Sequence, residues 1–438
     1  MVLSADVTTR LLGAIETDSL VFLCGAGLSI PSPSDLPSAA RVSQICYDAW
    51  RHTEALNPAL RNDIDQLAGH FYARGDFQRV FIRLVPWNEL VGPPNSGHAA
   101  VADLLISRGA HAALSANFDA MIERWAEERK IAMQGALTGQ EAVTFTVTNP
   151  LIKFHGCLQR GREMTLWTQA QLAEPAVQAR VASCSQWMNL HLPGKHLVVV
   201  GFWTDWGYLN NVIADAFAIN SASSVTVIDP RAAADLQAKA PHLWAKLNSL
   251  SLIFEHVMAS GVDALDELQT VYSKTWARKF YALGQPLVQA AGGAVAVAAP
   301  FDALRGDDLY NLRRDAEGVP YTRAARLKAP APDAAQAASM HVMLLNAGAT
   351  NLGAWLQHGG QSIRVVNGAG RGLTDVQGGY KEPTTVAQSD IVVCAGAIEL
   401  GVPAKLIAPG RGASTIRPTP GGSARWLTLE QAQVELGL

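Results

Sequence analysis

The sequence SLVFLCGAGLS, residues 19–29, joins an apolar run to a loop that carries two glycines. The apolar part, residues 19–24, is short and bounded by a turn signal, which predicts a buried β-strand. Glycine and alanine in the loop let the backbone approach a pyrophosphate, and the N–H groups after the turn can donate to it. A tight strand-to-helix turn without a ligand has the same pattern. The stretch therefore predicts a strand whose end is suited to a phosphate.

Short apolar runs alternate with helical patterns as far as about residue 282. Further strands are expected at residues 112–116, 151–155, 196–201, 224–228 and 252–254. The helical patterns between the strands cover residues 38–50, 63–73, 98–107, 118–128 and 208–219. This alternation predicts an α/β fold, a Rossmann-like parallel sheet with helices on both faces. Such sheets bind their ligands at the carboxyl ends of the strands.

Polar side chains follow two of the predicted strands. Asn117 and Asp119 come directly after one strand, and His155 lies at the end of the next. A histidine whose pKa is near neutral can act as a general base, and an asparagine can hold ribose hydroxyls or a water. Helix capping by Asn and Asp, and a structural histidine, are the alternative interpretations. These three residues are the candidates for catalysis.

Two later strand ends carry acidic residues. Asp205 follows the strand that ends at Gly201, and Asp229 follows the next strand. Asp229, at the end of its strand, is placed to bond ribose hydroxyls, and both residues are candidates for cofactor binding. His98 begins a helical pattern after the sequence PPNSG, and we expect it to be structural.

The ordered set of motifs resembles that of the sirtuin-like NAD-binding family. The motifs are Gly-Ala-Gly-x-Ser at residues 25–29, Ser-x-Asn-x-Asp at residues 115–119 and Lys-x-His-Gly at residues 153–156, followed by the strand ends at Gly201 and Asp229. The resemblance covers about residues 15–275. It implies a Rossmann-type sheet with NAD⁺ lying across the strand ends.

The resemblance also implies roles for single residues. His155 would be the general base, Asn117 would bond the ribose next to nicotinamide, and Asp119 would hold the carboxamide or brace the loop. Asp229 stands where the family often has an Asn that contacts the adenosine ribose. The residues expected to bind the cofactor are Gly25, Ala26, Gly27, Ser29, Gly201, Asp205 and Asp229.

Three departures from the family pattern indicate a divergent branch. Sirtuin deacylases carry two C-x-x-C pairs soon after the His-Gly motif, and this chain has only Cys157 and Cys184 there. The sequence PSPSDLP at residues 31–37 replaces Gly-Ile-Pro-Asp-Phe-Arg, and Ala116 replaces a Gln. Without C-x-x-C pairs no zinc is expected. The pattern resembles the zinc-free NAD⁺ hydrolases of bacterial anti-phage defence.

This resemblance implies an NAD⁺ glycohydrolase that cleaves NAD⁺ to ADP-ribose and nicotinamide as a defence effector. Nicotinamide leaves through an oxocarbenium-like state, so the site must orient the ribose and supply a nucleophile. Water is the expected acceptor when no acyl-lysine is bound. Two alternatives stay open, an NAD-dependent protein deacylase and a non-catalytic module that binds NAD or another nucleotide.

The length of 438 residues favours two or three domains. We expect a sirtuin-like NAD-binding catalytic domain at residues 1–283 and a connecting segment at residues 284–339. Residues 340–438 are rich in glycine and predict a small α/β domain with a regulatory or assembly role. Its strands are expected at residues 341–345, 362–366, 390–394 and 404–407.

Two further segments of the C-terminal region carry charge or glycine. The charged residues 307–317 predict a solvated helix, with a contact to a subunit or partner as the alternative. The loop at residues 367–372 follows a predicted strand and contains three glycines. It could cradle a phosphate with Arg371 as the counter-charge, or its glycines could serve turns alone.

Composition limits the remaining function classes. Hydrophobic residues make up 49% and charged residues 17%, as in folded soluble proteins. The net charge of −3 provides no direct signal for nucleic acid, and no stretch is apolar enough for a membrane span. Five scattered cysteines without a secretory signal pattern favour the cytoplasm. We expect a homo-oligomer, with a protein partner or a nucleotide activator acting through the C-terminal region.

Overall fold

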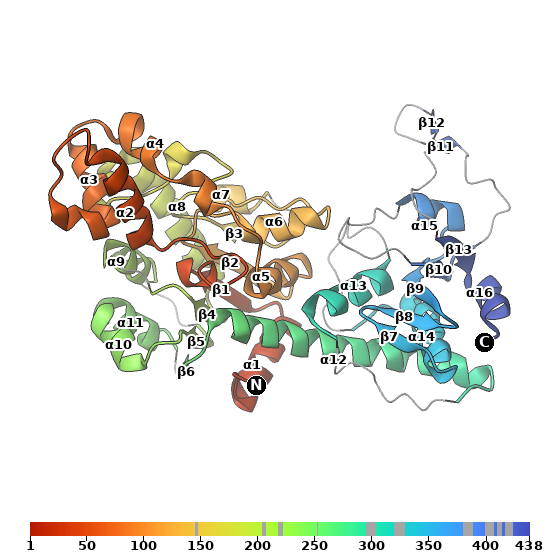
Figure 1. The fold of residues 1–438 in the computed structure, drawn as a ribbon. Coiled ribbons are helices and arrows are strands. Elements are labelled where there is room, and N and C mark those ends of the chain that lie inside the picture. The colour runs from red at the N-terminus through yellow and green to blue at the C-terminus, as the bar shows by residue number, and fades with distance from the viewer. Residues whose placement is uncertain are drawn as a thin grey trace. The chain divides into compact units, whose positions relative to one another are not determined.

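The computed structural model describes residues 1–144, 148–203, 207–217, 222–251, 253–294, 304–318, 329–379, 389–398, 407–409, 414–416 and 424–438. These residues form two compact units (Figure 1). The N-terminal unit comprises Met1–Glu128 and Ala132–Leu268, and the C-terminal unit comprises Arg129–Ile131 and Gln269–Leu438. Each unit has its own sheet and its own buried core.

A six-stranded sheet organises the N-terminal unit. Its strands are β1 (Leu20–Cys24), β2 (Ala110–Ser115), β3 (Leu151–Ile152), β4 (His196–Val200), β5 (Ser224–Ile228) and β6 (Phe254–Val257). They lie in the order β3-β2-β1-β4-β5-β6, and every neighbouring pair is parallel. This is the Rossmann strand order, in which ligands bind where the order reverses. The α/β fold expected from the sequence is confirmed.

The helices of this unit begin at capping residues that the sequence provides. The hydroxyl of Ser38 accepts from the backbone N–H of Arg41, and the carboxylate of Asp63 accepts from that of Gln66. Such caps satisfy N–H groups that a first turn leaves without partners. The helices are α1 (Ala5–Glu16), α2 (Ala39–Trp50), α3 (Ile64–Ala73), α4 (Ile82–Leu84), α5 (Ser96–Ile106), α6 (Met121–Glu128), α7 (Gly139–Ala142), α8 (Pro175–His191), α9 (Gly207–Ala216), α10 (Ala233–Lys239), α11 (Pro241–Ser249) and the first part of α12 (Gly261–Ala290).

Most of the sheet is buried on both faces. Every residue of β1 and of β5 is buried, as expected for parallel strands covered on two sides. Side chains of Leu23, Leu114 and Val199 from three neighbouring strands belong to one apolar cluster with Ile213 of α9. Packing of this kind fixes the strands, so the loops that leave their carboxyl ends start from fixed points.

The C-terminal unit contains a smaller mixed sheet. Its strands are β7 (Thr350–Leu352), β8 (Trp355–His358), β9 (Gln361–Asn367), β10 (Ile391–Ala395) and β13 (Arg425–Thr428), in the order β13-β10-β9-β8-β7. Strands β9, β10 and β13 are parallel, and β7 and β8 are antiparallel to their neighbours. The helices are α13 (Gly306–Glu317), α14 (Ala335–Asn346), α15 (Leu373–Gly379) and α16 (Leu429–Leu436), and β11 (Ile407–Pro409) pairs with β12 (Ser414–Ile416). A second, smaller α/β unit is therefore present.

Two expectations for this unit were wrong. Residues 341–345, predicted as a strand, lie in helix α14, because a short apolar run of Met, Val and Leu fits a buried helix as well as a strand. Residues 307–317 are helical, but α13 is buried rather than solvated. Its Asp315 accepts from Nε of Arg364 at 2.8 Å and from a terminal nitrogen of the same guanidinium at 2.9 Å. The charges of α13 thus include a buried ion pair, a role that a charge count does not reveal.

Of the strand expected at residues 404–407, residues 404–406 lie outside the described part of the chain. No helix within the described ranges is both long enough and apolar enough to cross a bilayer.

Candidate active site

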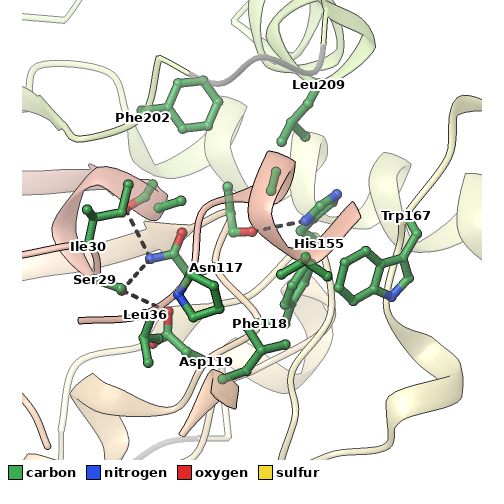
Figure 2. A pocket seen from close by; sticks show the side chains of 17 residues that line it. Ser29, Ile30, Leu36, Asn117, Phe118, Asp119, His155, Trp167, Phe202 and Leu209 are labelled. Carbon is green, nitrogen blue, oxygen red and sulfur yellow. Dashed lines mark hydrogen bonds between the residues drawn. The ribbon is translucent and has the colours of Figure 1, made fainter. Parts of the chain in front are cut away.

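A pocket lies at the carboxyl ends of β1, β2 and β3 (Figure 2). It encloses about 690 Å³ of empty space, including its opening to solvent, which is within the usual range for ligand pockets. Apolar side chains form most of its wall. The polar side chains that line it are those of Ser29, Asn117, Asp119 and His155, which come from three different strand ends.

The glycines of the first loop allow close approach of two backbones. A Cβ on Gly25 would lie 2.4 Å from the Cα of Phe202, and one on Gly27 would lie 2.8 Å from the Cα of Gly201. The N–H of Gly25 donates to Val200 O at 3.1 Å, and the N–H of Gly27 donates to Gly201 O at 2.9 Å. These glycines are therefore required by packing of the β1 end against the β4 end, whether or not a ligand binds.

One backbone donor of this loop is still available for a ligand. Ala26 opens a short 3₁₀ turn, Ala26–Leu28, and lines the pocket. The N–H groups of Leu28 and Ser29 donate to carbonyls of the same turn. Within the described ranges no acceptor is found for the N–H of Ala26. An N–H at the start of a turn that has no partner is suited to an anionic oxygen.

The amide of Asn117 has a defined orientation. Its Nδ2 donates to Gly25 O at 3.0 Å and to the Ser29 Oγ at 3.1 Å (Figure 2). An amide nitrogen carries two protons, and both are used here. Within the described ranges the Asn117 Oδ1 has no partner, so this oxygen is the atom of the amide that can accept from a ligand hydroxyl or a water.

Asp119 is held on both carboxylate oxygens. Its Oδ2 accepts from the Ser29 hydroxyl at 2.8 Å, and its Oδ1 accepts from the N–H of Met121, the first residue of α6, at 3.2 Å. The side chain is 8% exposed and lines the pocket. Asp119 thus supports the loop and also places a negative charge beside the pocket.

His155 is fully buried at the pocket wall. Its Nδ1 lies 3.0 Å from Ala116 O, and its ring stacks on Phe118 with centroids 5.2 Å apart. A carbonyl can only accept, so Nδ1 carries the proton and Nε2 is the basic nitrogen. Burial, helped by the nearby Arg180 guanidinium, lowers the pKa of His155 to about 3, although the bond to Ala116 opposes this shift. His155 is therefore neutral at pH 7 and can take up a proton at Nε2.

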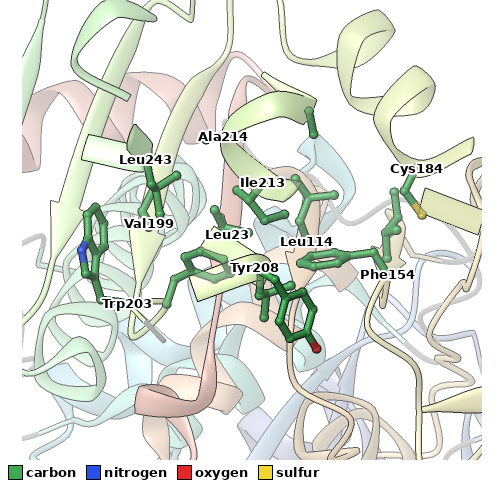
Figure 3. Close-up of a cluster of buried hydrophobic side chains, with 14 of the residues drawn as sticks. Leu23, Leu114, Phe154, Cys184, Val199, Trp203, Tyr208, Ile213, Ala214 and Leu243 are labelled. Atoms are coloured by element: carbon green, nitrogen blue, oxygen red, sulfur yellow. The ribbon is translucent and has the colours of Figure 1, made fainter. Parts of the chain in front are cut away.

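Tyr208 contacts this basic nitrogen. The Tyr208 hydroxyl lies 3.3 Å from the His155 Nε2, at the start of α9. Its ring belongs to the buried cluster that also holds Leu114 and Phe154 (Figure 3). Tyr208 could not be predicted from the sequence, because nothing in a helix that begins Gly-Tyr-Leu indicates a partner 53 residues away.

A buried ion pair supports the same strand ends. Lys153 and Glu123 are each 1% exposed, and the Lys153 Nζ lies 3.1 Å from the Glu123 Oε1. The Lys153 ammonium also donates to Asp119 O. Burial would lower the pKa of Lys153, but the charges of Glu123, Cys157 and Asp119 outweigh burial and raise it. Lys153 therefore stays charged and ties β3 to the loop that carries Asp119.

Three other residues expected at the site, Gly27, Gly201 and Asp229, do not line the pocket. Gly27 and Gly201 form the contact between strand ends, and Asp205 lies outside the described residues. Asp229 is 3% exposed and binds Arg231 through both oxygens, with Nε–Oδ1 and terminal N–Oδ2 distances of 2.9 Å. In this structure the Asp229 carboxylate is engaged by protein rather than directed to the pocket.

The cysteines near the site are separate and buried. The Sγ of Cys157 donates to a Glu123 oxygen at 3.7 Å, and that of Cys184 donates to Leu137 O at 3.4 Å. Burial raises the pKa of Cys184 to about 12 and also raises that of Cys157. Thiols bind metals as thiolates, which this environment disfavours. In the described part of the chain no three His, Cys, Asp or Glu side chains are grouped as metal ligands.

In the glycine loop of the C-terminal unit, residues 367–372, backbone N–H groups donate to acceptors within the same unit. The N–H groups of Gly368, Ala369, Gly370 and Arg371 donate to Ala395 O, Asn367 Oδ1, Gly396 O and Gly368 O respectively. The Arg371 guanidinium donates to Gly368 O and Asn367 O. A phosphate at this loop would have to displace these contacts, so its role as a phosphate cradle stays a prediction.

Comparison with known proteins finds similarity only at the level of solved structures. No protein-family model and no curated protein matches this chain. The structure described as "Sir2-p53 peptide-NAD+" is 14% identical and covers 61% of this chain and 98% of its own, with a TM-score of 0.33. A Sir2 homolog–NAD complex is 14% identical, and the match covers 59% of this chain and 91% of that chain with a TM-score of 0.35. Likeness this weak establishes neither activity nor substrate.

Proposed function

We propose that this protein is an NAD⁺ glycohydrolase that cleaves NAD⁺ to ADP-ribose and nicotinamide. One observation carries the proposal. A single pocket at the carboxyl ends of β1, β2 and β3 is lined by Ser29, Asn117, Asp119 and His155. These are polar residues of the three motifs that resemble those of sirtuin-like NAD-binding proteins. The neutral His155, with Nε2 as its basic nitrogen, supplies a proton acceptor in this pocket.

The chemistry needs a weak base and an oriented ribose. The C1′–N bond breaks with its electron pair leaving on nicotinamide, and a bond forms between C1′ and a water oxygen. The attacking water becomes a strong acid as it bonds to the oxocarbenium carbon, so even a base of low pKa can take its proton. In the proposed mechanism His155 takes that proton at Nε2. The Asn117 Oδ1 accepts from a ribose hydroxyl or from the water, and the Asp119 charge favours the developing cation.

The apolar wall has a part in this mechanism. Phe118, Trp167, Phe202 and Leu209 line the pocket and limit the number of waters that reach it. They also offer a surface for the aromatic nicotinamide ring. Ala26 would donate its N–H to the pyrophosphate. Gly25, Gly27 and Gly201 would act indirectly, by allowing the loop to lie against β4.

The experiment is to incubate the full-length protein with NAD⁺ and to measure nicotinamide and ADP-ribose by chromatography. His155→Ala and Asn117→Ala should each lower the rate by about 10²- to 10⁴-fold. The matched controls are His242→Ala and Asn62→Ala, whose side chains bind Asp215 and Gln44 outside the pocket. Nicotinamide release by the His155 or Asn117 variant at the parental rate would show that the site assignment is wrong.

The same experiment separates the two alternatives. Formation of O-acyl-ADP-ribose from an acyl-lysine peptide would indicate a protein deacylase. Tight NAD⁺ binding in calorimetry without turnover would indicate a binding module. Metal analysis belongs with these assays, because we propose that the chain carries no zinc. One zinc per chain would contradict this and favour the deacylase.

The biological setting is also part of the proposal. The motif resemblance supports an anti-phage effector that depletes NAD⁺ in the cytoplasm. Such an enzyme must be restrained at rest, and we propose that the C-terminal unit or homo-oligomer assembly provides the restraint. Loss of cellular NAD⁺ only after phage infection, together with protection that His155→Ala abolishes, would support this role. Unchanged NAD⁺ levels in infected cells would contradict it.

A further inference from the structure

The network around Ser29 continues to a residue outside the pocket lining, His98. This histidine is 1% exposed and is the third residue of α5. Its Nε2 lies 3.1 Å from the Ser29 Oγ, and its Nδ1 lies 3.2 Å from the backbone nitrogen of Asn95. The Asn95 side chain in turn accepts from the N–H of His98 at 3.2 Å, which completes a capping box. His98 therefore joins the start of α5 to the first loop of the pocket.

These contacts determine the tautomer of His98. A backbone N–H can only donate, so the Nδ1 that faces Asn95 must accept and carries no proton. Burial lowers the pKa of His98 to about 4, although the Asp119 charge opposes this, and the ring is neutral at pH 7. Its one ring proton is therefore on Nε2 and is donated to the Ser29 Oγ.

The tautomer in turn determines the direction of every bond at Ser29. A hydroxyl has one proton and two lone pairs. The lone pairs of Ser29 accept from the His98 Nε2–H and from the Asn117 Nδ2–H, so its proton must go to the Asp119 Oδ2 at 2.8 Å. The relay runs from Asn95 N–H to His98, then to Ser29 and to Asp119. It leaves the Asn117 Oδ1 as the acceptor available for a ligand.

We propose that His98 is a positioning residue that, through Ser29, sets the orientation of Asn117 and Asp119 in the pocket. The inference rests on the proposed NAD⁺ hydrolysis. A histidine that served only as a helix cap would need its Nδ1 contact and nothing from Nε2. The second contact reaches across 69 residues to the hydroxyl that binds both site residues. Without it, Ser29 can rotate and the Asn117 amide loses a fixed partner.

The test compares two near-isosteric variants. In His98→Gln the amide oxygen can accept from Asn95, as Gln does in an ordinary capping box, and its NH₂ can donate to Ser29. In His98→Met both contacts are lost while the volume is nearly kept. We expect His98→Met to lower kcat for nicotinamide release by about ten-fold or more with little change in KM, and His98→Gln to recover most of it. Urea unfolding of each variant establishes that it is folded.

A double-mutant cycle distinguishes this positioning role from a purely structural role of His98. In a Ser29→Ala background the relay is already broken, so adding His98→Met should change kcat by no more than about two-fold. An equal loss of kcat in both backgrounds would overturn the proposal. A folded His98→Met protein with parental kcat would overturn it as well.

A separate measurement distinguishes this inference from the proposed function. If the parent releases no nicotinamide, the proposed hydrolase activity fails by itself. ¹⁵N NMR of histidine-labelled protein then decides whether the relay exists. We expect the His98 signals of a neutral Nε2–H ring, which should shift in Ser29→Ala. An Nδ1–H ring, or signals that Ser29→Ala leaves unchanged, would overturn the relay.

Discussion

The hydroxyl of Tyr208 lies 3.3 Å from the His155 Nε2, the nitrogen that the proposed hydrolysis needs as its base. Nδ1 of the same ring donates to Ala116 O, so in this arrangement the Tyr208 O–H is the donor and Nε2 the acceptor. A hydrogen bond to the neutral ring stabilises that form and makes Nε2 less basic. Before a water can give its proton to His155, the Tyr208 hydroxyl must turn or move away.

Tyr208→Phe should therefore raise the rate of nicotinamide release. Removal of the hydroxyl keeps the buried ring and deletes the competing bond, which is worth about 0.5–1.5 kcal/mol. We expect an increase of about two- to ten-fold in kcat, measured by chromatography at pH 7. Tyr281→Phe is a suitable control, because Tyr281 is a buried tyrosine that contacts His341 in the C-terminal unit. A ten-fold or greater loss in Tyr208→Phe would instead make Tyr208 part of the proton transfer.

The buried histidines predict that stability falls with acidification. Burial lowers the pKa of His98 to about 4 and that of His155 to about 3, whereas both are near 6.5 in the unfolded chain. The unfolded state then binds more protons below pH 6.5, so each histidine stabilises the folded state above that pH and the stabilisation is lost as pH falls. Between pH 7 and pH 5 each should cost about 2 kcal/mol of unfolding free energy.

Urea unfolding of the N-terminal unit at pH 7 and pH 5 measures this loss. Carboxylates with lowered pKa contribute to the pH dependence only at more acidic values. His98→Gln removes one titrating group, so its unfolding free energy should fall by about 2 kcal/mol less than that of the parent. Equal pH dependence in the two proteins would show that His98 is not held neutral by burial.

The sequence was most informative where local pattern and fold agree. Apolar runs that end in glycine or in Asn and Asp placed β1, β2 and β4 within two residues of their observed ends. Because parallel strands end at one edge, the residues after them had to gather there. Ser29, Asn117, Asp119 and His155 all line the pocket, although their catalytic roles stay predictions.

The sequence did not predict the features that depend on tertiary packing. His98 could be identified as a helix-start residue, but the bond from its Nε2 to Ser29 joins α5 to a loop that is distant in the sequence. The same holds for Tyr208, whose hydroxyl meets His155 only after α9 packs on the sheet. Helix α14 was mistaken for a strand because its apolar residues are buried in a small core from several sides. A period of about 3.6 in the apolar residues indicates a helix with one buried face. A helix that is buried on several sides does not show this period.

Removal of Lys153 should destabilise the protein more than removal of its whole ion pair. Lys153→Met leaves the Glu123 carboxylate buried without its cation, which should cost about 3–5 kcal/mol in urea unfolding. The double variant Lys153→Met with Glu123→Leu replaces both charges by apolar groups and should recover much of that loss. If the double variant is no more stable than the single one, the bond from Lys153 to Asp119 O matters more than the ion pair.

An added methyl group at Gly201 should strongly destabilise the folded protein. Its φ of +58° is in the left-handed region, and a Cβ there would lie 2.6 Å from Leu28 N and 2.7 Å from Gly27 C. Backbone atoms cannot yield as a flexible side chain does, so Gly201→Ala must push the first loop away from β4. Positive φ and overpacking together should cost about 3 kcal/mol or more in urea unfolding. The displaced loop carries Ala26 and Ser29, so nicotinamide release should fall too.

Gly13→Ala is the matched control for Gly201→Ala. Gly13 lies inside α1, and a Cβ there would have no heavy atom within 4 Å apart from the helix itself. Alanine is the better helix former, so this variant should gain about 0.5–1 kcal/mol and keep full activity. If Gly201→Ala were as stable and as active as Gly13→Ala, the contact between the ends of β1 and β4 would not be what requires glycine at residue 201. The first loop would then not need its contact with the end of β4 to be placed for a pyrophosphate.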